Sequence, residues 1–309
     1  MKNLFKPDVA IILPVFNGEK TLNNTVNSLL DQSHSNFILY ICDDGSKDGS
    51  YDLMKKYKSK KIKIFKNKKN MGLGYTLNKL VSLCDENINF IAMAEQDDFY
   101  YSYRLEKQVK YLNKNKDVGL VSGIADHWDG TRITTRFPGI LVKEENYPIG
   151  IEFFKYNYRE QIKVVNSCIM FRKDIHNKNK IKFSETYPSL SVDWDYILRF
   201  SLKSRIHGLK VSLVRLDRSY SRGSLTTKNI IKYETANKLI KNFYEEFPDI
   251  ITFYDYKYAC ATQRYLELGN EKYFVRIKNS FKILFIDPLK IRSLKIFFYT
   301  IIKPFLKIF

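Results

Sequence analysis

The sequence predicts an α/β fold, in which a mainly parallel central sheet is flanked by helices and followed by a helical extension at the carboxyl end. Apolar runs typical of buried strands alternate with helical patterns through the first half of the chain. Such alternation indicates βαβ units with right-handed crossovers. With 309 residues and 44% hydrophobic composition, the chain can bury the core that such a sheet requires.

The strands expected in the first half are apolar, and helical patterns follow them. Residues 9–16 form an apolar run broken only by Pro14, and Leu22, Val26 and Leu29 then recur at helical spacing. Further strands are expected at 37–42, 62–65 and 90–94, and further helices at 73–83 and 103–112.

The second half is less regular. Strands are expected at 119–125, 164–171 and 211–216, a polar irregular stretch at 126–147, and a helix at 191–200. From residue 227 the pattern is helical to the end. We therefore expect a first domain at 1–225 and a helical region at 226–309.

Charge and composition narrow the function classes. The net charge of +19 would attract nucleic acid, anionic lipid or phosphate-bearing substrates, although a general drift toward lysine would produce the same excess. The cysteines and histidines form no CxxC or HExxH pattern, which argues against a zinc site and for a reducing, cytoplasmic setting. Residues 1–8 carry charge and proline where an export signal needs an apolar core.

Three strand ends carry unusual chemistry. In parallel sheets ligands bind beyond the carboxyl ends of the strands, so these side chains should line one pocket. No glycine-rich phosphate loop follows any strand, so the phosphates of a bound nucleotide would be held by a metal ion instead. The three ends read Pro14-Val15-Phe16-Asn17, Asp43-Asp44-Gly45-Ser46 and Glu95-Gln96-Asp97-Asp98.

The third end is the most informative, because an apolar strand there runs directly into three carboxylates. Buried negative charge needs compensation, and a divalent cation bound to a diphosphate would supply it. From this segment alone, an acidic turn at a strand end is an equal alternative.

These segments together resemble the inverting glycosyltransferases of family 2, which have the Rossmann-like GT-A fold. The resemblance covers roughly residues 8–225. It rests on the three strand ends and on Gln32-Ser33, Asn70-Met71-Gly72, Asn78 and Val192-Asp193-Trp194-Asp195. It implies transfer of a sugar from a nucleotide-sugar, usually UDP-linked, to a hydroxyl group, in a catalytic domain at 1–225.

The resemblance assigns the donor pocket. Phe16 would lie against the uracil, Asp44 would accept a hydrogen bond from its N3–H, and Asp43 would support that turn or reach the ribose. Alternatively, both aspartates only cap the turn that follows them. The nucleotide-binding residues that the resemblance implies are Pro14, Phe16, Asn17, Asp43, Asp44, Gly72, Glu95 and Arg222.

The acidic cluster corresponds to the family's metal-binding DxD motif. The resemblance implies that Asp97 and Asp98 hold Mn²⁺ or Mg²⁺ against the diphosphate. Glu95 stands where many members have aspartate, and it would reach a ribose hydroxyl or a metal-bound water. Many relatives also carry a histidine near 220, which this chain lacks. Arg222 would contact the diphosphate in its place, or belong to a plain surface loop.

Asp193 and Asp195 are the candidates for the base that accepts the proton of the acceptor hydroxyl. They project about 200° apart on a helix, so periodicity alone does not choose between them. Arg199 lies four residues after Asp195, a favourable ion-pair spacing that gives Asp195 a structural role. The resemblance also places the base at Asp193, whose alternative role is that of an acid favoured by the helix dipole.

The tail, residues 282–309, mixes six basic residues with bulky apolar ones and has no apolar run long enough to span a membrane. It fits a helix lying on anionic lipid, or a segment that docks on protein.

We therefore expect a metal-dependent glycosyltransferase at the cytoplasmic face of the membrane, acting on a lipid-linked or oligosaccharide acceptor in bacterial-type surface polysaccharide synthesis. One alternative is a sugar nucleotidyltransferase. Such enzymes use a glycine-rich basic loop after the first strand, whereas this chain has Pro14-Val15-Phe16-Asn17-Gly18 there. Another alternative is a nucleic-acid-binding protein. The acidic strand ends argue against it, because they would repel the phosphates of a nucleic acid.

Overall fold

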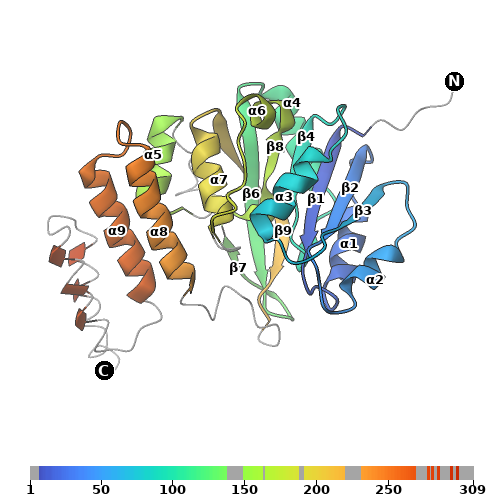
Figure 1. Cartoon of the computed structure of the whole chain (residues 1–309), viewed down its shortest axis with the longest axis horizontal. Coiled ribbons are helices and arrows are strands. Elements are labelled where there is room, and N and C mark those ends of the chain that lie inside the picture. Colours follow the sequence, from blue (N-terminus) through green and yellow to red (C-terminus); the bar gives the residue numbers. More distant parts are fainter. Residues whose placement is uncertain are drawn as a thin grey trace. The chain divides into compact units, whose positions relative to one another are not determined.

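The structure is a computed structural model that describes residues 7–137, 149–162, 164–187, 191–219 and 231–268, with isolated positions between 277 and 298 (Figure 1). The predicted α/β class is confirmed. The chain divides into two compact units. The sheet unit is Met1–Gly150 and Lys163–Lys228, and the helical unit is Ile151–Ile162 and Asn229–Phe309. The expected boundary at 225 lies outside the described residues.

Within the described residues, the sheet unit is built on one sheet of nine strands in the order β3-β2-β1-β4-β8-β6-β9-β5, with β7 paired to β6. Strands β1 to β4 pair in parallel, whereas β5, β7 and β8 pair antiparallel to their neighbours. The sheet is therefore mixed. The strands are β1 (Val9–Val15), β2 (Phe37–Asp43), β3 (Ile62–Lys66), β4 (Phe90–Met93), β5 (Asp98–Tyr100), β6 (Val118–Trp128), β7 (Ile133–Phe137), β8 (Met170–Arg172) and β9 (Arg205–Asp217).

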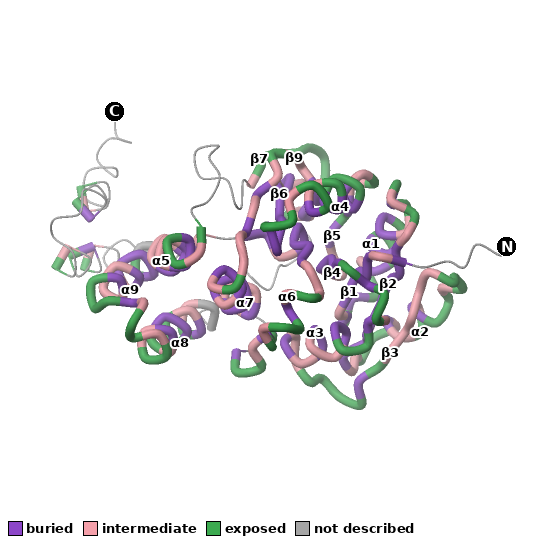
Figure 2. The backbone as a smooth tube through the Cα atoms, turned by 90° about the horizontal axis from the view of Figure 1, so that it is seen from above, coloured by how far each residue is buried: buried purple, intermediate pink, exposed green. Residues whose placement is uncertain are grey.

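Helices cover both faces of this sheet (Figure 2). One face carries α1 (Leu22–Leu30) and α4 (Arg104–Lys114), and the other carries α3 (Leu73–Ser82), α6 (Lys173–Lys178) and α7 (Val192–Ser201). The short helix α2 (Ser50–Lys55) follows β2. Burial on both faces explains why β1 and β2 read as continuous apolar runs instead of alternating ones.

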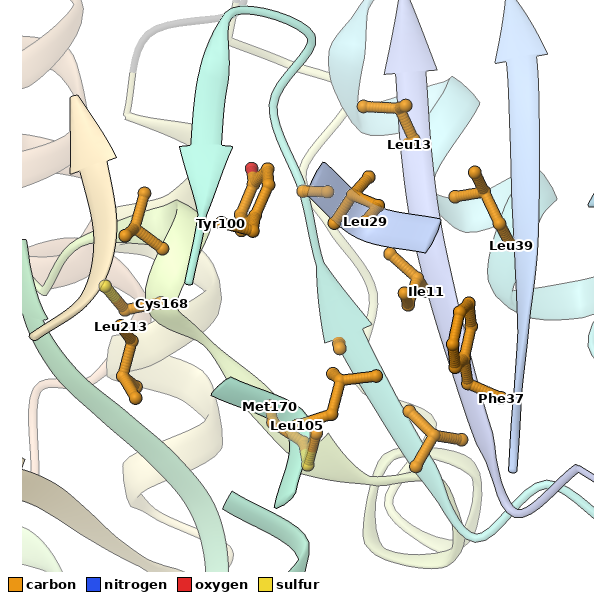
Figure 3. Packing of buried hydrophobic residues seen from close by; sticks show 14 of the residues in the cluster. Ile11, Leu13, Leu29, Phe37, Leu39, Tyr100, Leu105, Cys168, Met170 and Leu213 are labelled. Carbon is orange, nitrogen blue, oxygen red and sulfur yellow. The ribbon is translucent and has the colours of Figure 1, made fainter. Parts of the chain in front are cut away.

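The core on the α1 side is aliphatic. Ile11 and Leu13 of β1 lie with Leu39 of β2 and Leu29 of α1 in one buried cluster (Figure 3). The core on the α7 side is aromatic, because the rings of Phe183 and Tyr196 stack with their centroids 4.0 Å apart. Both layers hold the carboxyl ends of β1, β2 and β4 at one edge of the sheet.

The helical unit contains α5 (Ile151–Glu160), α8 (Ile231–Glu246) and α9 (Phe253–Leu268). The buried Tyr158 hydroxyl donates to the Ile240 carbonyl at 2.7 Å. Asp255 on α9 lies 3.3 Å from the Lys155 ammonium and 3.4 Å from the Arg159 guanidinium of α5. In the part of the chain that is described, no helix combines the length and apolar character needed to cross a membrane.

One strand prediction was largely wrong. Of residues 164–171, only the last two belong to a strand, β8, and a 3-10 turn, η1 (Asn166–Cys168), precedes it. The run is buried as expected, but the side chains of Asn166 and Ser167 turn toward carboxylates of another loop. The stretch expected to be irregular, 126–147, contains the end of β6 and all of β7.

Candidate active site

Gln96 fastens the loop after β1 to the loop after β4. The Phe16 N–H donates to Gln96 Oε1 at 2.7 Å, and Gln96 Nε2 donates to the Phe16 carbonyl at 2.9 Å. The Phe16 ring remains 39% exposed at the strand end, so one of its faces is accessible to a planar base. Pro14 lies two residues earlier, half-buried within β1.

Asn17 joins the first strand end to the second. Its backbone adopts the left-handed conformation, with φ of 52°, which asparagine tolerates better than most residues. Its N–H donates to Ser46 Oγ at 2.9 Å, and its Oδ1 accepts from the Lys47 N–H at 2.9 Å. Its backbone and side chain therefore hold the first and second strand ends together.

Asp44 anchors the segment that leads into α3. Its carboxylate accepts hydrogen bonds from Asn67 Nδ2 at 2.7 Å and from the N–H groups of Met71 at 2.8 Å and Gly72 at 2.9 Å. Gly72 has φ of 90°, a conformation that side-chain-bearing residues rarely adopt. Asp44 and Gly72, both predicted to contact the nucleotide, thus contact each other.

Asp43 is fully buried beside them, and its carboxylate accepts fewer hydrogen bonds than that of Asp44. One of its oxygens accepts from the Ser46 N–H at 3.3 Å. The other has no hydrogen-bond partner among the described residues, and the Lys66 ammonium lies 4.0 Å away. A buried carboxylate oxygen is usually hydrogen-bonded. Asp43 can therefore accept a further hydrogen bond from a ligand, whereas most of the acceptor sites of Asp44 already have donors.

The three acids after β4 lie together, as the sequence predicts. Glu95, Asp97 and Asp98 each offer a carboxylate oxygen within 4.8 Å of the others. Asp98 is 4% exposed, and burial, followed by the neighbouring Glu95 carboxylate, holds the pKa of Asp98 well above its ordinary value. Negative charge is thus crowded where a positive ion would relieve it.

The turn η1 supports this cluster from the other side. Asn166 Nδ2 donates to Glu95 Oε1 at 2.8 Å, and Ser167 Oγ forms a short hydrogen bond with an Asp98 oxygen. Asn166 Oδ1 is buried and has no hydrogen-bond partner in the described ranges. The three carboxylates form an all-oxygen donor set, which fits a hard cation such as Mg²⁺ or Mn²⁺.

A buried arginine lies in the same region. Arg104 is 0% exposed, and its guanidinium donates to the carbonyls of Met93 at 2.7 Å and Ile169 at 3.2 Å. It also lies 4.8 Å from the centroid of the Tyr100 ring, whose hydroxyl accepts from the Glu95 N–H at 2.7 Å. Arg104 therefore links the ends of β4 and η1, the two segments that carry the acidic cluster and its supports.

The helix α7 presents the two candidate bases differently. Asp195 is 1% exposed and pairs with Arg199, whose Nε lies 3.1 Å from its Oδ2, so the predicted ion pair is confirmed. Asp193 is half-buried on the first turn, where its Oδ1 accepts from the Trp194 N–H at 2.9 Å. Asp195 therefore has the structural role that the sequence predicts, and the assignment of the base to Asp193 stays a prediction.

Sequence reasoning missed Gln96, Asn166, Ser167 and Arg104. Gln96 lies inside the acidic motif, so its position was a usable signal, whereas the other three approach the site only through the fold. Arg222, the expected diphosphate contact, lies outside the described residues.

A mixed α/β sheet with an acidic cluster at the end of a central strand is the arrangement expected of a GT-A glycosyltransferase. Residues 10–179 match the sequence profile of the family described as glycosyl transferase family 2, more than half of the chain. The chain belongs to this family.

Curated relatives agree with this assignment. EpsE of Bacillus subtilis, named as a glycosyltransferase, is 36% identical over 147 residues, which are 44% of this chain and 52% of EpsE. TuaG of the same organism, named as a teichuronic acid biosynthesis glycosyltransferase, is 31% identical over 110 residues, 35% of this chain and 43% of TuaG. The matched segments thus span about half the length of these relatives.

Solved structures share the fold. TarS 1-349 of S. aureus has a TM-score of 0.62 at 17% identity, covering 95% of this chain and 81% of that one. A TarS structure in complex with UDP-GlcNAc gives 0.61 at 15% identity, covering 95% and 79%. The mannosyltransferase PcManGT of Pyrobaculum calidifontis, in complex with GDP-Man and Mn²⁺, gives 0.55 at 12% identity, covering 98% and 87%.

Proposed function

We propose that the protein is an inverting, divalent-metal-dependent glycosyltransferase that moves a sugar from a nucleotide-sugar, UDP-linked in our proposal, to a hydroxyl of a saccharide or lipid-linked acceptor. The observation that carries this proposal is the acidic cluster of Glu95, Asp97 and Asp98, whose oxygens lie within 4.8 Å of one another. The relatives' glycosyltransferase names and the structural neighbours with bound UDP-GlcNAc or GDP-Man support it.

The donor would bind across the three strand ends. The exposed Phe16 ring offers a stacking surface for the base, worth on the order of 1 kcal/mol. Asp44 retains acceptor capacity on Oδ2 for a base N–H, and Asp43 has an unpartnered oxygen beside it. Pro14, Asn17 and Gly72 would border the bound nucleotide.

Asp97 and Asp98 would hold Mn²⁺ or Mg²⁺, with Glu95 directed to the ribose or to a metal-bound water. When bound, the ion would supply Lewis-acid stabilisation of the charge that develops on the departing diphosphate. PcManGT, whose structure contains Mn²⁺, shares this fold. Arg222 would add a cationic contact to the diphosphate.

Asp193 would act as general base. Its carboxylate would accept the proton of the acceptor hydroxyl while that oxygen bonds to the anomeric carbon and the bond from this carbon to the diphosphate breaks. A single displacement of this kind inverts the anomeric configuration.

The acceptor belongs, in our proposal, to surface polysaccharide assembly, because TuaG is named for teichuronic acid biosynthesis. Residues 282–309 would contact anionic lipid and keep the enzyme near a lipid-linked acceptor. Deleting these residues and fractionating the cells tests this contact, since an unchanged membrane-bound fraction would refute it.

The central test is thermal unfolding with UDP-glucose, UDP-GlcNAc and GDP-mannose, each with Mn²⁺. We expect one of them to stabilise the wild type by about 3 kcal/mol at a hundredfold excess over its Kd. Asp97→Ala should abolish this stabilisation. Asp52→Ala, which removes an exposed carboxylate paired with Lys55, should preserve it. The proposal is wrong if no donor stabilises the wild type, or if the Asp97→Ala protein is stabilised equally.

A further inference from the structure

A strip of aromatic side chains extends from β5 and the turn after it to the end of β6. This aromatic strip consists of Tyr103, Tyr101, Phe99 and Trp128. The rings of Tyr101 and Tyr103 stack with centroids 5.6 Å apart, and Phe99 meets Tyr101 edge to face at 5.9 Å. Phe99 is 36% exposed and follows Asp98 in β5, where successive side chains point to opposite faces, so the strip begins on the face of β5 opposite the Asp98 carboxylate.

Arg215 on β9 connects the two halves of the strip. Its guanidinium carbon lies 4.5 Å from the centroid of the Phe99 ring and 4.7 Å from that of Trp128. In the sheet, Arg215 is the register partner of Phe99 on β5 and of Asp126 on β6. The three residues therefore form one row across neighbouring strands.

The charge of Arg215 is not matched within this row. The nearest carboxylate in register, Asp126, is 2% exposed and accepts hydrogen bonds from the Tyr101 hydroxyl at 2.7 Å and from Ser212 Oγ at 2.7 Å, while Arg136 Nε lies 3.4 Å away. Among the described residues, Arg215 has no ion pair within 4.0 Å. Asp126 thus orients the Tyr101 ring, and the Arg215 guanidinium remains available to a ligand.

We propose that the aromatic strip and Arg215 form a binding site for an anionic saccharide, the acceptor of the glycosyl transfer. Aromatic side chains offer flat apolar surface, against which the apolar face of a sugar ring can pack. The planar Arg215 fork matches a carboxylate or phosphate group on the sugar. The acceptor role rests on the proposed function, whereas saccharide binding itself does not.

The chain offers a direct reporter of this site. It contains two tryptophans, Trp128 and Trp194, so Trp194→Phe leaves Trp128 as the single tryptophan. Its fluorescence would be titrated with hyaluronan hexasaccharide, which carries carboxylates, and with the neutral chitohexaose. We expect a saturable change with the hyaluronan hexasaccharide and at least tenfold weaker binding of chitohexaose.

Variants in this background test each part of the site. Phe99→Ala should weaken binding at least tenfold, and Arg215→Gln should remove the preference for the anionic ligand. Arg205→Gln, at the other end of the same strand and paired with Asp117, is the matched control and should bind like its parent. Thermal unfolding of each variant checks that it is folded.

Two outcomes would overturn the inference: no saturable response to the hyaluronan hexasaccharide, or an equal response to chitohexaose that Arg215→Gln leaves unchanged. Nucleotide-sugar protection, measured on the same Trp194→Phe protein, separates this inference from the proposed function. If a nucleotide-sugar protects the protein but no saccharide binds, the proposed saccharide site is wrong and the proposed function stands. Saccharide binding without donor protection refutes the acceptor role and leaves the saccharide site in place.

Discussion

Arg104 is expected to be one of the most important single residues for the stability of the sheet unit. It is 0% exposed, and it donates to three acceptors: the carbonyls of Met93 and Ile169 and the side-chain oxygen of Gln108, at 2.7, 3.2 and 3.2 Å. The Ile169 carbonyl also accepts from the Met93 N–H at 2.9 Å, so two of the three acceptors depend on Arg104. Arg104→Met keeps much of the aliphatic stem and removes every donor. The substitution therefore isolates the contribution of the guanidinium.

The magnitude follows from these contacts. Each buried acceptor left without a donor costs about 1–3 kcal/mol, so the two that depend on Arg104 would cost roughly 2–6 kcal/mol. The substitution also removes the cost of burying the guanidinium, since burial lowers the pKa of Arg104. We expect a net loss of about 3–5 kcal/mol, the range measured when a buried charge network is broken.

Urea denaturation followed by circular dichroism measures this loss. Arg172→Met is the matched control, because Arg172 also donates to backbone carbonyls and lies over a ring, that of Phe90, at 5.4 Å, but is only half-buried. Water can reach the groups it leaves, so we expect the control to lose about 1–2 kcal/mol. A loss below 1 kcal/mol for Arg104→Met, or equal losses for both variants, would refute the reasoning.

Three further predictions concern pH, catalysis and the donor loop. Burial lowers the pKa of His176 to about 4; because the unfolded chain binds this proton near pH 6.5, stability should fall by about 3 kcal/mol as pH drops from 6.5 to 4. Urea titrations should show a flatter profile for His176→Gln, and an unchanged slope would contradict this assignment. Asp193→Asn should lower kcat about 10²–10⁴-fold while donor protection persists, whereas Asp195→Asn should mainly lower stability; equal kcat losses in two folded variants would argue against Asp193 as the base. Gln96→Ala should weaken nucleotide binding about tenfold in calorimetry, because it releases the Phe16 loop. The free energy of unfolding should fall by about 1 kcal/mol. An unaltered nucleotide affinity would show that this loop does not bind the base.

The strands and helices of the first half could be predicted from the sequence because their apolar patterns are local. Residues 9–16, for example, form β1 almost without error, since a strand buried on both faces reads as a continuous apolar run. The short strand β5 and the turn η1 could not be predicted, because three-residue elements have no periodicity and form through tertiary pairing.

The candidate site divides in the same way. The clustering of Glu95, Asp97 and Asp98 was predictable, because they are adjacent in sequence and follow one strand. The contacts of Asn166 and Ser167 with these acids span about 70 residues of sequence, and only the fold brings them together. The hydrogen bonds of Asp44 to Asn67, Met71 and Gly72 could not be predicted either, because they depend on the conformation of the loop before α3.

The most direct test of the central claim is the calorimetric titration of UDP into the protein, with and without Mn²⁺. We expect Mn²⁺ to tighten UDP binding at least tenfold in the wild type, because Asp97 and Asp98 would hold the ion against the diphosphate. This gain should disappear in Asp97→Asn. A UDP affinity that is the same with and without Mn²⁺ in the wild type would show that no metal ion holds the diphosphate at this site.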